Sequence, residues 1–130
     1  MTTVTAALIL CGDRFLICRR RADQPSPLKW EFAGGKIEEG EEPAAGLRRE
    51  LKEELNIEAG IGPEVRRLVC QYPGRPPILL LFFKVTDFQG KLENRVFAEI
   101  RWVPRQQLPG FDFLEADRQV AKEIARGGLV

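Results

Sequence analysis

Histidine is absent from the 130 residues of this chain, and cysteine occurs only three times. The lack of histidine excludes catalysis by an imidazole and removes a ligand on which many protein zinc sites depend. Cys11, Cys18 and Cys70 are odd in number and show no Cys-x-x-Cys spacing. This pattern favours reduced thiols in the core over a disulfide framework or a zinc site.

Long hydrophobic runs are also missing, since no stretch of eighteen apolar residues occurs. The segment Met1–Cys11 lacks the basic start and the cleavage site of a signal peptide. We therefore expect no membrane span, no membrane partner and a cytoplasmic location.

Charge of one sign is not in excess: 20 basic and 19 acidic residues leave a formal net charge of +1. Broad polynucleotide-binding surfaces normally need a basic excess, so we expect no polynucleotide partner. The average hides two clusters, because eight acids lie between Glu38 and Glu58 and a basic run occupies Arg19–Arg21. Such a pair of clusters suits a metal-bound polyphosphate, although two solvated surface patches would produce the same pattern.

The length indicates one domain, residues 1–130. Leu47, Leu51 and Leu55 recur every four residues and Pro43 suits a first helical turn, which predicts a helix from about 43 to 55. Apolar runs and turn residues predict the other elements: strands at 4–11, 15–18, 30–32, 65–72, 78–86 and 100–103, loops at 20–29, 33–35 and 87–95, and a helix at 115–126. Strands mixed with two helices predict an α/β fold, a mixed sheet covered on both faces as an α/β/α sandwich.

Acidic residues gather on one surface of the first predicted helix. Glu50, Glu53 and Glu54 stand at positions i, i+3 and i+4, so they are neighbours there. Like charges one turn apart destabilise a helix unless something neutralises them, and a hard divalent cation does so. The alternative is an ordinary solvated helix face, which is common in charged helices.

The flanking residues favour a ligand site. Gly34 and Gly35 precede the helix, so the backbone can approach a ligand closely and a carbonyl can serve as a metal ligand. Gly46 falls on the side of the acids, where a side chain would obstruct a ligand, although glycine costs about 1 kcal/mol in a helix. Arg49 lies four residues before Glu53 and could orient it.

The segment Gly35–Ile57 resembles the signature of the Nudix hydrolase superfamily. Five residues separate Gly35 from Glu41, seven more lead to Arg49-Glu50-Leu51, and Glu53-Glu54 follow. Asn56 stands where the family usually has glycine, but Asn tolerates the left-handed conformation that ends such a helix. The run Trp-Glu-Phe-Ala-Gly-Gly-Lys at 30–36 is similar to the MutT branch and its bacterial CTP pyrophosphohydrolases. The resemblance implies a Nudix-type α/β/α sandwich.

The resemblance also implies a metal centre. Glu50, Glu53, Glu54 and the Gly34 carbonyl would hold Mg²⁺, for which Mn²⁺ could substitute. Glu53 is the first choice for activating water. Glu99 is a candidate additional ligand or alternative base.

The substrate contacts that the resemblance implies lie elsewhere in the chain. Arg20 would bind phosphate with help from Lys36, whereas Arg49 with Glu41 would brace the loop and the helix more than take part in chemistry. Asp117 stands where MutT-like enzymes read the base, but an acid there would equally stabilise a helix N-terminus. The base pocket could be lined by Phe32, Leu81 and Phe83, or all three residues could belong to the core.

The implied reaction is attack of activated water within a nucleoside triphosphate, which releases a nucleoside monophosphate and pyrophosphate. The substrates would be 8-oxo-dGTP or CTP and dCTP, the role would be cleansing of the nucleotide pool for DNA repair, and the protein would be a monomer or a weak homodimer. Pro73 also keeps open the hydrolysis of ADP-ribose or dinucleoside polyphosphates. A nucleotide-sensing Nudix domain without activity is the alternative of another class.

Overall fold

A mixed sheet forms the centre of the molecule in a computed structural model that describes residues 1–130. Its path runs β3-β2-β1-β7-β6, while β4 pairs with β1 and β9 with β2. The strands β1 and β7 run parallel and all other pairs run antiparallel. The strands of this sheet are β1 (Thr2–Cys11), β2 (Arg14–Arg19), β3 (Trp30–Glu31), β4 (Gly34–Lys36), β6 (Glu64–Cys70), β7 (Ile78–Val85) and β9 (Glu99–Pro104).

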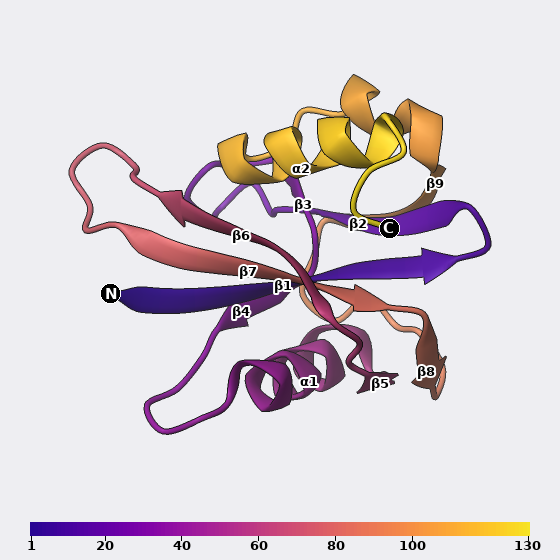
Figure 1. Cartoon of the computed structure of the whole chain (residues 1–130), viewed down its shortest axis with the longest axis horizontal. Helices are drawn as coiled ribbons and strands as arrows, with labels where there is room; N and C mark the ends of the chain where they lie inside the picture. Colours follow the sequence, from indigo (N-terminus) through magenta and orange to yellow (C-terminus); the bar gives the residue numbers. More distant parts are fainter.

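Two helices cover opposite faces of this sheet, with α1 (Pro43–Leu55) below it and α2 (Glu115–Ala125) above it in Figure 1. A 3₁₀ helix, η1 (Arg105–Gly110), precedes α2. The α/β/α sandwich that the sequence predicts is therefore confirmed, and the two long helices lie where the apolar spacing places them. The helix α1 ends at Asn56, which adopts the left-handed conformation with φ 61° and donates its backbone N–H to Lys52 O.

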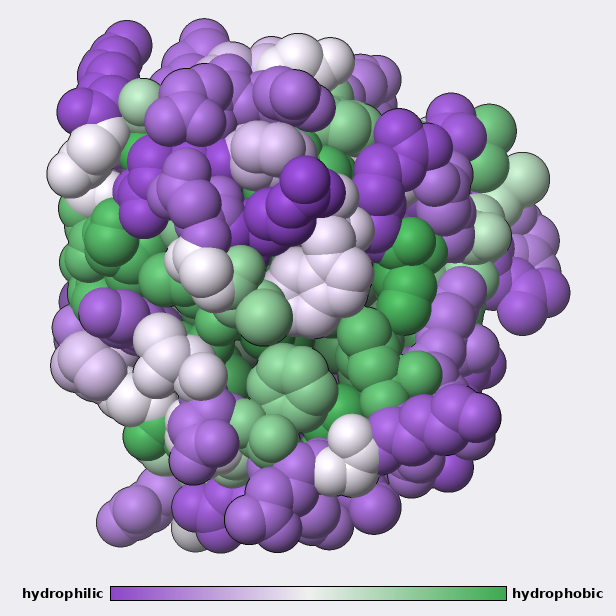
Figure 2. Space-filling model, turned by 90° about the vertical axis from the view of Figure 1, so that its right-hand side faces the viewer, coloured by the Kyte–Doolittle hydropathy of each residue, from purple (hydrophilic) through white to green (hydrophobic).

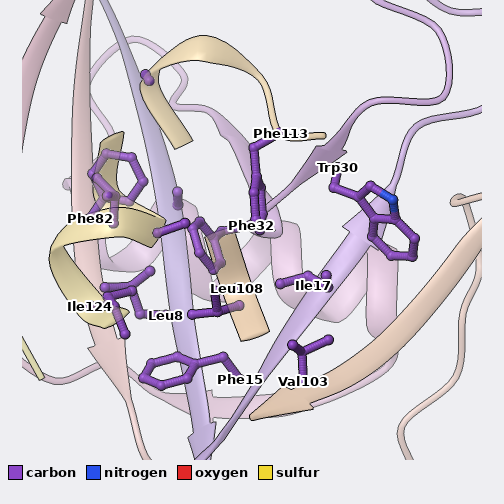
Figure 3. Close-up of a cluster of buried hydrophobic side chains, with 14 of the residues drawn as sticks. Leu8, Phe15, Ile17, Trp30, Phe32, Phe82, Val103, Leu108, Phe113 and Ile124 are labelled. Atoms are coloured by element: carbon purple, nitrogen blue, oxygen red, sulfur yellow. The ribbon is translucent and has the colours of Figure 1, made fainter. Parts of the chain in front are cut away.

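The sheet is buried on both faces, because alternate residues of its central strands enter two separate cores. Leu8 and Phe82 belong to the core beneath α2 (Figure 3), whereas Ile9 and Phe83 belong to the core beneath α1. In Figure 3, Phe32 lies between Phe82 and Phe113, with ring centroids 6.4 and 5.3 Å away. These contacts hold β3 and the segment after it against the α2 side.

Several short elements differ from the sequence prediction. Residues 33–35 were expected in a loop, but Gly34–Lys36 form β4, and Asp87–Gln89 in the expected loop 87–95 form β8. The strand β8 pairs with β5 (Glu58–Gly60), which the sequence analysis did not predict, and η1 was not predicted either. Three-residue strands are too short to show a period of two, and glycine has little strand preference, so pairing with neighbours decides these elements.

The cysteines occupy three environments. Cys18 is buried and Cys70 is half-buried, as expected, but Cys11 is exposed because it lies at the end of β1 beside the turn. No disulfide links them. The prediction of a core thiol is therefore wrong for Cys11.

None of the helices combines the length and the apolar character needed to cross a bilayer. Figure 2 shows the end of the molecule where the β1–β2 turn and β8 lie in Figure 1. Apolar residues gather in the middle of that face and polar residues surround them.

Candidate active site

The three acids of α1 have different environments. The side chain of Glu53 is 60% exposed, whereas that of Glu50 is only 16% exposed. Glu54 lies against β4, where its Oε1 accepts the Gly34 N–H at 3.2 Å. Burial, together with the charges of Glu50 and Glu31, raises the pKa of Glu54 to about 9 against the opposing hydrogen bond from Gly34.

Glu50 is also withdrawn from water. Burial raises the pKa of its carboxyl group, and the adjacent guanidinium of Arg49 opposes that shift. Glu50 and Glu54 thus present two shielded, neighbouring carboxyl groups whose joint ionisation is unfavourable without a counter-charge. This donor set fits a hard divalent cation. No three acidic or cysteine side chains converge on one point, so the carboxylates do not form a closed cage, and Mg²⁺ normally keeps several waters instead of using one.

The two glycines of β4 allow the close approach between this strand and its neighbours. A Cβ on Gly34 would lie 2.0 Å from Thr5 O, and a Cβ on Gly35 would lie 2.6 Å from the carboxyl carbon of Glu50. Any side chain at position 35 would therefore displace Glu50. The Gly-Gly pair is a packing requirement for the acidic helix, and this contact is what sets Glu50 against the strand.

Gly46 serves a different purpose from the one that the sequence suggested. A Cβ there would lie 2.6 Å from Ile37 Cγ2 and 2.8 Å from Glu41 Oε1. The residue is buried under the segment that precedes α1. The expectation that Gly46 clears space for a ligand is wrong, because the loop itself fills that space.

Arg49 links the loop, the strand and the helix. Its Nε and Nη2 donate to the two carboxylate oxygens of Glu41 at 2.9 and 3.0 Å, and Nη2 also donates to Lys36 O at 3.3 Å. The hydrogen bonds from Arg49 lower the pKa of Glu41 to about 2. Arg49 Nη1 lies 3.1 Å from Glu50 and 3.5 Å from Glu53. This geometry suits the bracing role expected of Glu41 and Arg49, and it keeps a positive charge among the acids.

A cleft of about 620 Å³ opens beside Glu54. It lies toward the end of the molecule where the N-terminus and β4 appear in Figure 1. The residues singled out from the sequence that line it are Arg20, Phe32, Gly34, Glu54 and Asp117. Several other residues line the cleft without being singled out from the sequence, among them Glu31, Tyr72, Val96 and Phe97. They come from three separate segments, so no spacing along the chain could have grouped them.

Arg20 is already partnered at the cleft wall. Its Nη1 lies 3.2 Å from Glu31 Oε2, and its Nε donates to Pro25 O at 2.8 Å. Burial raises the pKa of Glu31, and Arg20 opposes that shift. The expected phosphate-binding guanidinium is therefore held in place by a buried carboxyl group and by the 20–29 loop.

Asp117 occupies a position that both readings of the sequence require. It lies in the first turn of α2 and also lines the cleft, where its Oδ2 accepts the Phe32 N–H at 3.0 Å. Burial raises the pKa of Asp117 to about 8, and the charge of Glu31 contributes to the rise. A carboxyl group that is largely protonated at neutral pH can donate one hydrogen bond and accept another.

Several expected residues lie outside this cleft. Lys36 and Glu53 are exposed beyond its lining, and Glu99 on β9 accepts a hydrogen bond from Arg101 Nε at 2.9 Å. Leu81 and Phe83 are buried in the core beneath α1. The suggestion that these two line the base pocket is wrong, because the register of β7 turns them to the opposite face and presents other residues of the strand, Ile78 and Leu80, to the cleft.

Comparisons with known proteins identify the family and the fold of this chain. The family model described as NUDIX domain matches residues 1–125. The chain is 35% identical over 117 residues to the CTP pyrophosphohydrolase of Escherichia coli K12, covering 90% of this chain and 86% of that protein. It is 32% identical over 115 residues to the 8-oxo-dGTP diphosphatase of the same strain, covering 88% of each. The solution structure of the E. coli ORF135 protein superposes with a TM-score of 0.84 at 34% identity, covering 94% of this chain and 86% of that one.

Proposed function

The chain belongs to the Nudix hydrolase family, and we propose that it converts nucleoside triphosphates to monophosphates and pyrophosphate with Mg²⁺, or with Mn²⁺ as a substitute. One observation carries this proposal: the shielded carboxyl group of Glu54 lines a cleft large enough for a nucleotide, and the second shielded acid, Glu50, stands one helical turn before it. The relatives named CTP pyrophosphohydrolase and 8-oxo-dGTP diphosphatase support CTP, dCTP and 8-oxo-dGTP as the candidate substrates. The biological role would be removal of damaged precursors before they reach DNA.

The α1 end of the cleft would hold the cation and the phosphate chain. Glu50, Glu53, Glu54 and the Gly34 carbonyl are the proposed ligands. The cation, when bound, would neutralise phosphate charge and make a water molecule more acidic.

Glu53 is the exposed acid of the three, so it can accept the proton of the attacking water, and Arg49 at 3.5 Å orients it. Glu99 remains the alternative base. Lys36 supplies positive charge near the same end of the helix, where Arg49 binds its carbonyl oxygen.

The opposite end of the cleft would bind the base. Asp117, with its pKa raised to about 8, can present both a donor and an acceptor to a base edge while it fixes the Phe32 backbone. Phe32 packs in the core between Phe82 and Phe113, so the cleft wall that it contributes is rigid. Arg20, held by Glu31, would turn its remaining N–H groups toward the phosphates.

The same proposal treats residues 1–130 as one Nudix domain in the cytoplasm, a monomer or weak homodimer without polynucleotide or membrane partners. The two cores share the strands β1, β2 and β7, which supports a single folding unit. The balanced net charge supports the absence of a nucleic-acid surface.

Turnover of a substrate panel tests this function. The purified protein with Mg²⁺ would be given 8-oxo-dGTP, dGTP, CTP, dCTP, 5-methyl-dCTP and ADP-ribose, and kcat/KM and the products would be compared. Monophosphate plus pyrophosphate, lost without metal and in Glu53→Gln, is the expected result. ADP-ribose as the best substrate would overturn the triphosphate assignment, and nucleotide binding without turnover would favour a sensor.

A further inference from the structure

The segment Lys91–Ala98, called here the 91–98 loop, caps the C-terminal end of α1. The backbone N–H groups of Glu93 and Arg95 donate to Leu55 O and Glu54 O at 2.9 and 3.0 Å. Carbonyls in the last turn of a helix lack partners within the helix, so these bonds satisfy them. In Figure 1, β8, from which this loop leaves, lies beside β5 near that end of α1.

The other end of the 91–98 loop is fixed to the sheet and to itself. Ala98 N–H donates to Arg19 O at 2.9 Å, next to the cleft residue Arg20. The side chain of Asn94 makes two reciprocal bonds: its Oδ1 accepts the Phe97 N–H at 2.8 Å, and its Nδ2 donates to Phe97 O at 2.9 Å. Asparagine often closes a turn in this way. The backbone at position 97 is therefore held between α1 and β2.

The loop presents apolar side chains to the cleft. Val96, 38% exposed, and the half-buried Phe97 line it together with Glu54 and Arg20. Phe97 also packs on the core beneath α1, so its ring is supported from behind. An aromatic ring has no donor for phosphate oxygens, but its face and edge suit the apolar surface of a base or sugar.

We propose that Phe97 is a specificity-determining residue that contacts the nucleoside part of the triphosphate, and that Asn94 is the positioning residue that holds it there. This inference rests on the proposed hydrolysis of nucleoside triphosphates. It adds an aromatic wall, contributed by the 91–98 loop, to a cleft whose other apolar lining comes mainly from the sheet, for example Val4 and Leu80.

The test compares a nucleotide with a phosphate chain that has no nucleoside. KM and kcat would be measured for the best triphosphate of the substrate panel, and inorganic tripolyphosphate would be measured as a competitive inhibitor. In Phe97→Ala we expect KM to rise roughly tenfold, while the Ki of tripolyphosphate stays within about twofold. Phe97→Tyr, which keeps the ring, should restore KM. The turn survives in Phe97→Ala because Asn94 binds only backbone atoms of residue 97.

Phe88→Ala is the matched control. Phe88 on β8 is a half-buried phenylalanine that packs on the same core, but it does not line the cleft. Phe88→Ala should lower the melting temperature by about as much as Phe97→Ala does, and it should leave KM unchanged. A general loosening of the α1 side would instead raise KM in both variants and overturn the inference.

Asn94→Ala tests the positioning role. It removes both bonds to residue 97 and keeps the phenyl ring, so KM should rise and the double variant Asn94→Ala/Phe97→Ala should be no worse than Phe97→Ala alone. Additive losses would overturn the role of Asn94.

The two proposals fail in different ways. An active wild type with unchanged KM in Phe97→Ala, or an equal rise in KM and in the Ki of tripolyphosphate, overturns this inference and leaves the hydrolase intact. A wild type that hydrolyses no nucleotide overturns the proposed function and this inference with it.

Discussion

The two ends of the cleft are built in opposite ways. At the α1 end, Glu54 lines the cleft, and Glu50 and Glu53 stand beside it on the same helix. At the other end, Asp117 comes from α2, and the pair Arg20 and Glu31 beside it comes from the residue after β2 and from β3, so their order in the chain gives no hint of contact. Both ends contain a shielded carboxyl group, in Glu54 and in Asp117, whose pKa burial raises well above its ordinary range.

The difference lies in how each shielded group is satisfied. Glu54 stands among other acids, so a cation or a proton must balance them. Asp117 is buried next to one acid, and both effects favour its protonated form over the opposing hydrogen bond from the Phe32 N–H, so it can remain protonated without a metal. The α1 end of the cleft therefore suits phosphate chemistry, and the Asp117 end suits recognition of the base. Changes at the α1 end should therefore reduce kcat, and changes at the Asp117 end should alter KM and base preference.

The largest effect is expected from Glu53→Gln. Loss of the proposed base should lower kcat by about 10²- to 10⁴-fold with little change in KM, since the amide cannot accept the proton. Steady-state kinetics on the preferred triphosphate measures this, with Glu99→Gln beside it. A comparable fall in Glu99→Gln, with Glu53→Gln nearly active, would transfer the role to Glu99.

The second-largest effect is expected from Gly35→Ala, because the new Cβ would lie 2.6 Å from the carboxyl carbon of Glu50. The displaced acid should reduce kcat roughly 100-fold. The unfolding free energy should change little, because the atoms that the Cβ meets are the far end of the flexible Glu50 side chain. Gly110→Ala is the matched control, because nothing lies within 4 Å of its Cβ position. Activity rates and urea unfolding measure both variants, and an unchanged kcat in Gly35→Ala would show that Glu50 need not contact β4.

Asp117→Asn tests the proposed base recognition at the Asp117 end of the cleft. The amide oxygen can still accept the Phe32 N–H, but the edge presented to the base changes. We expect the ratio of kcat/KM between cytosine and guanine substrates to shift roughly tenfold, mostly through KM, since one hydrogen bond to the base is exchanged. If kcat falls equally for every base, Asp117 serves the chemistry instead and the division between the two ends is wrong.

The smallest effect concerns the pH dependence of stability. The folded chain holds a proton on Asp117 up to about pH 8, against an ordinary value of 3.8. The folded state therefore binds more protons than the unfolded state between these values, so Asp117 makes stability fall as pH rises through that window.

The groups near Asp117 are the acid Glu31 on β3, the base Arg20 after β2 and the Phe32 N–H, together with the thiols of Cys18 and Cys70 and the Tyr72 hydroxyl. Urea unfolding of the metal-free protein between pH 5 and pH 8 should show a shallower decline in Asp117→Asn than in the wild type. Equal slopes would mean that Asp117 is ionised in the folded protein.

Some features could be predicted from the sequence because they depend on neighbours along the chain. The stripe of Leu47, Leu51 and Leu55 predicted the helix α1 and its buried face, and all three are fully buried. The left-handed end at Asn56 was expected from the resemblance to the Nudix signature, in which Asn56 stands at the position of a glycine that ends the helix. The acids of this helix stand on one surface for the same reason, since a turn of 3.6 residues places them there.

Only the tertiary structure decided the remainder of the site. In the folded chain, Gly46 packs beneath the loop that precedes α1. Leu81 and Phe83 face away from the cleft, whereas Glu31 and Phe97 line it. A helix repeats by a local geometry that the residues of one segment determine, whereas a cleft wall depends on which strands pair, in which register, and on where a loop returns. Those contacts join residues tens of positions apart, so no spacing within a single segment specifies them.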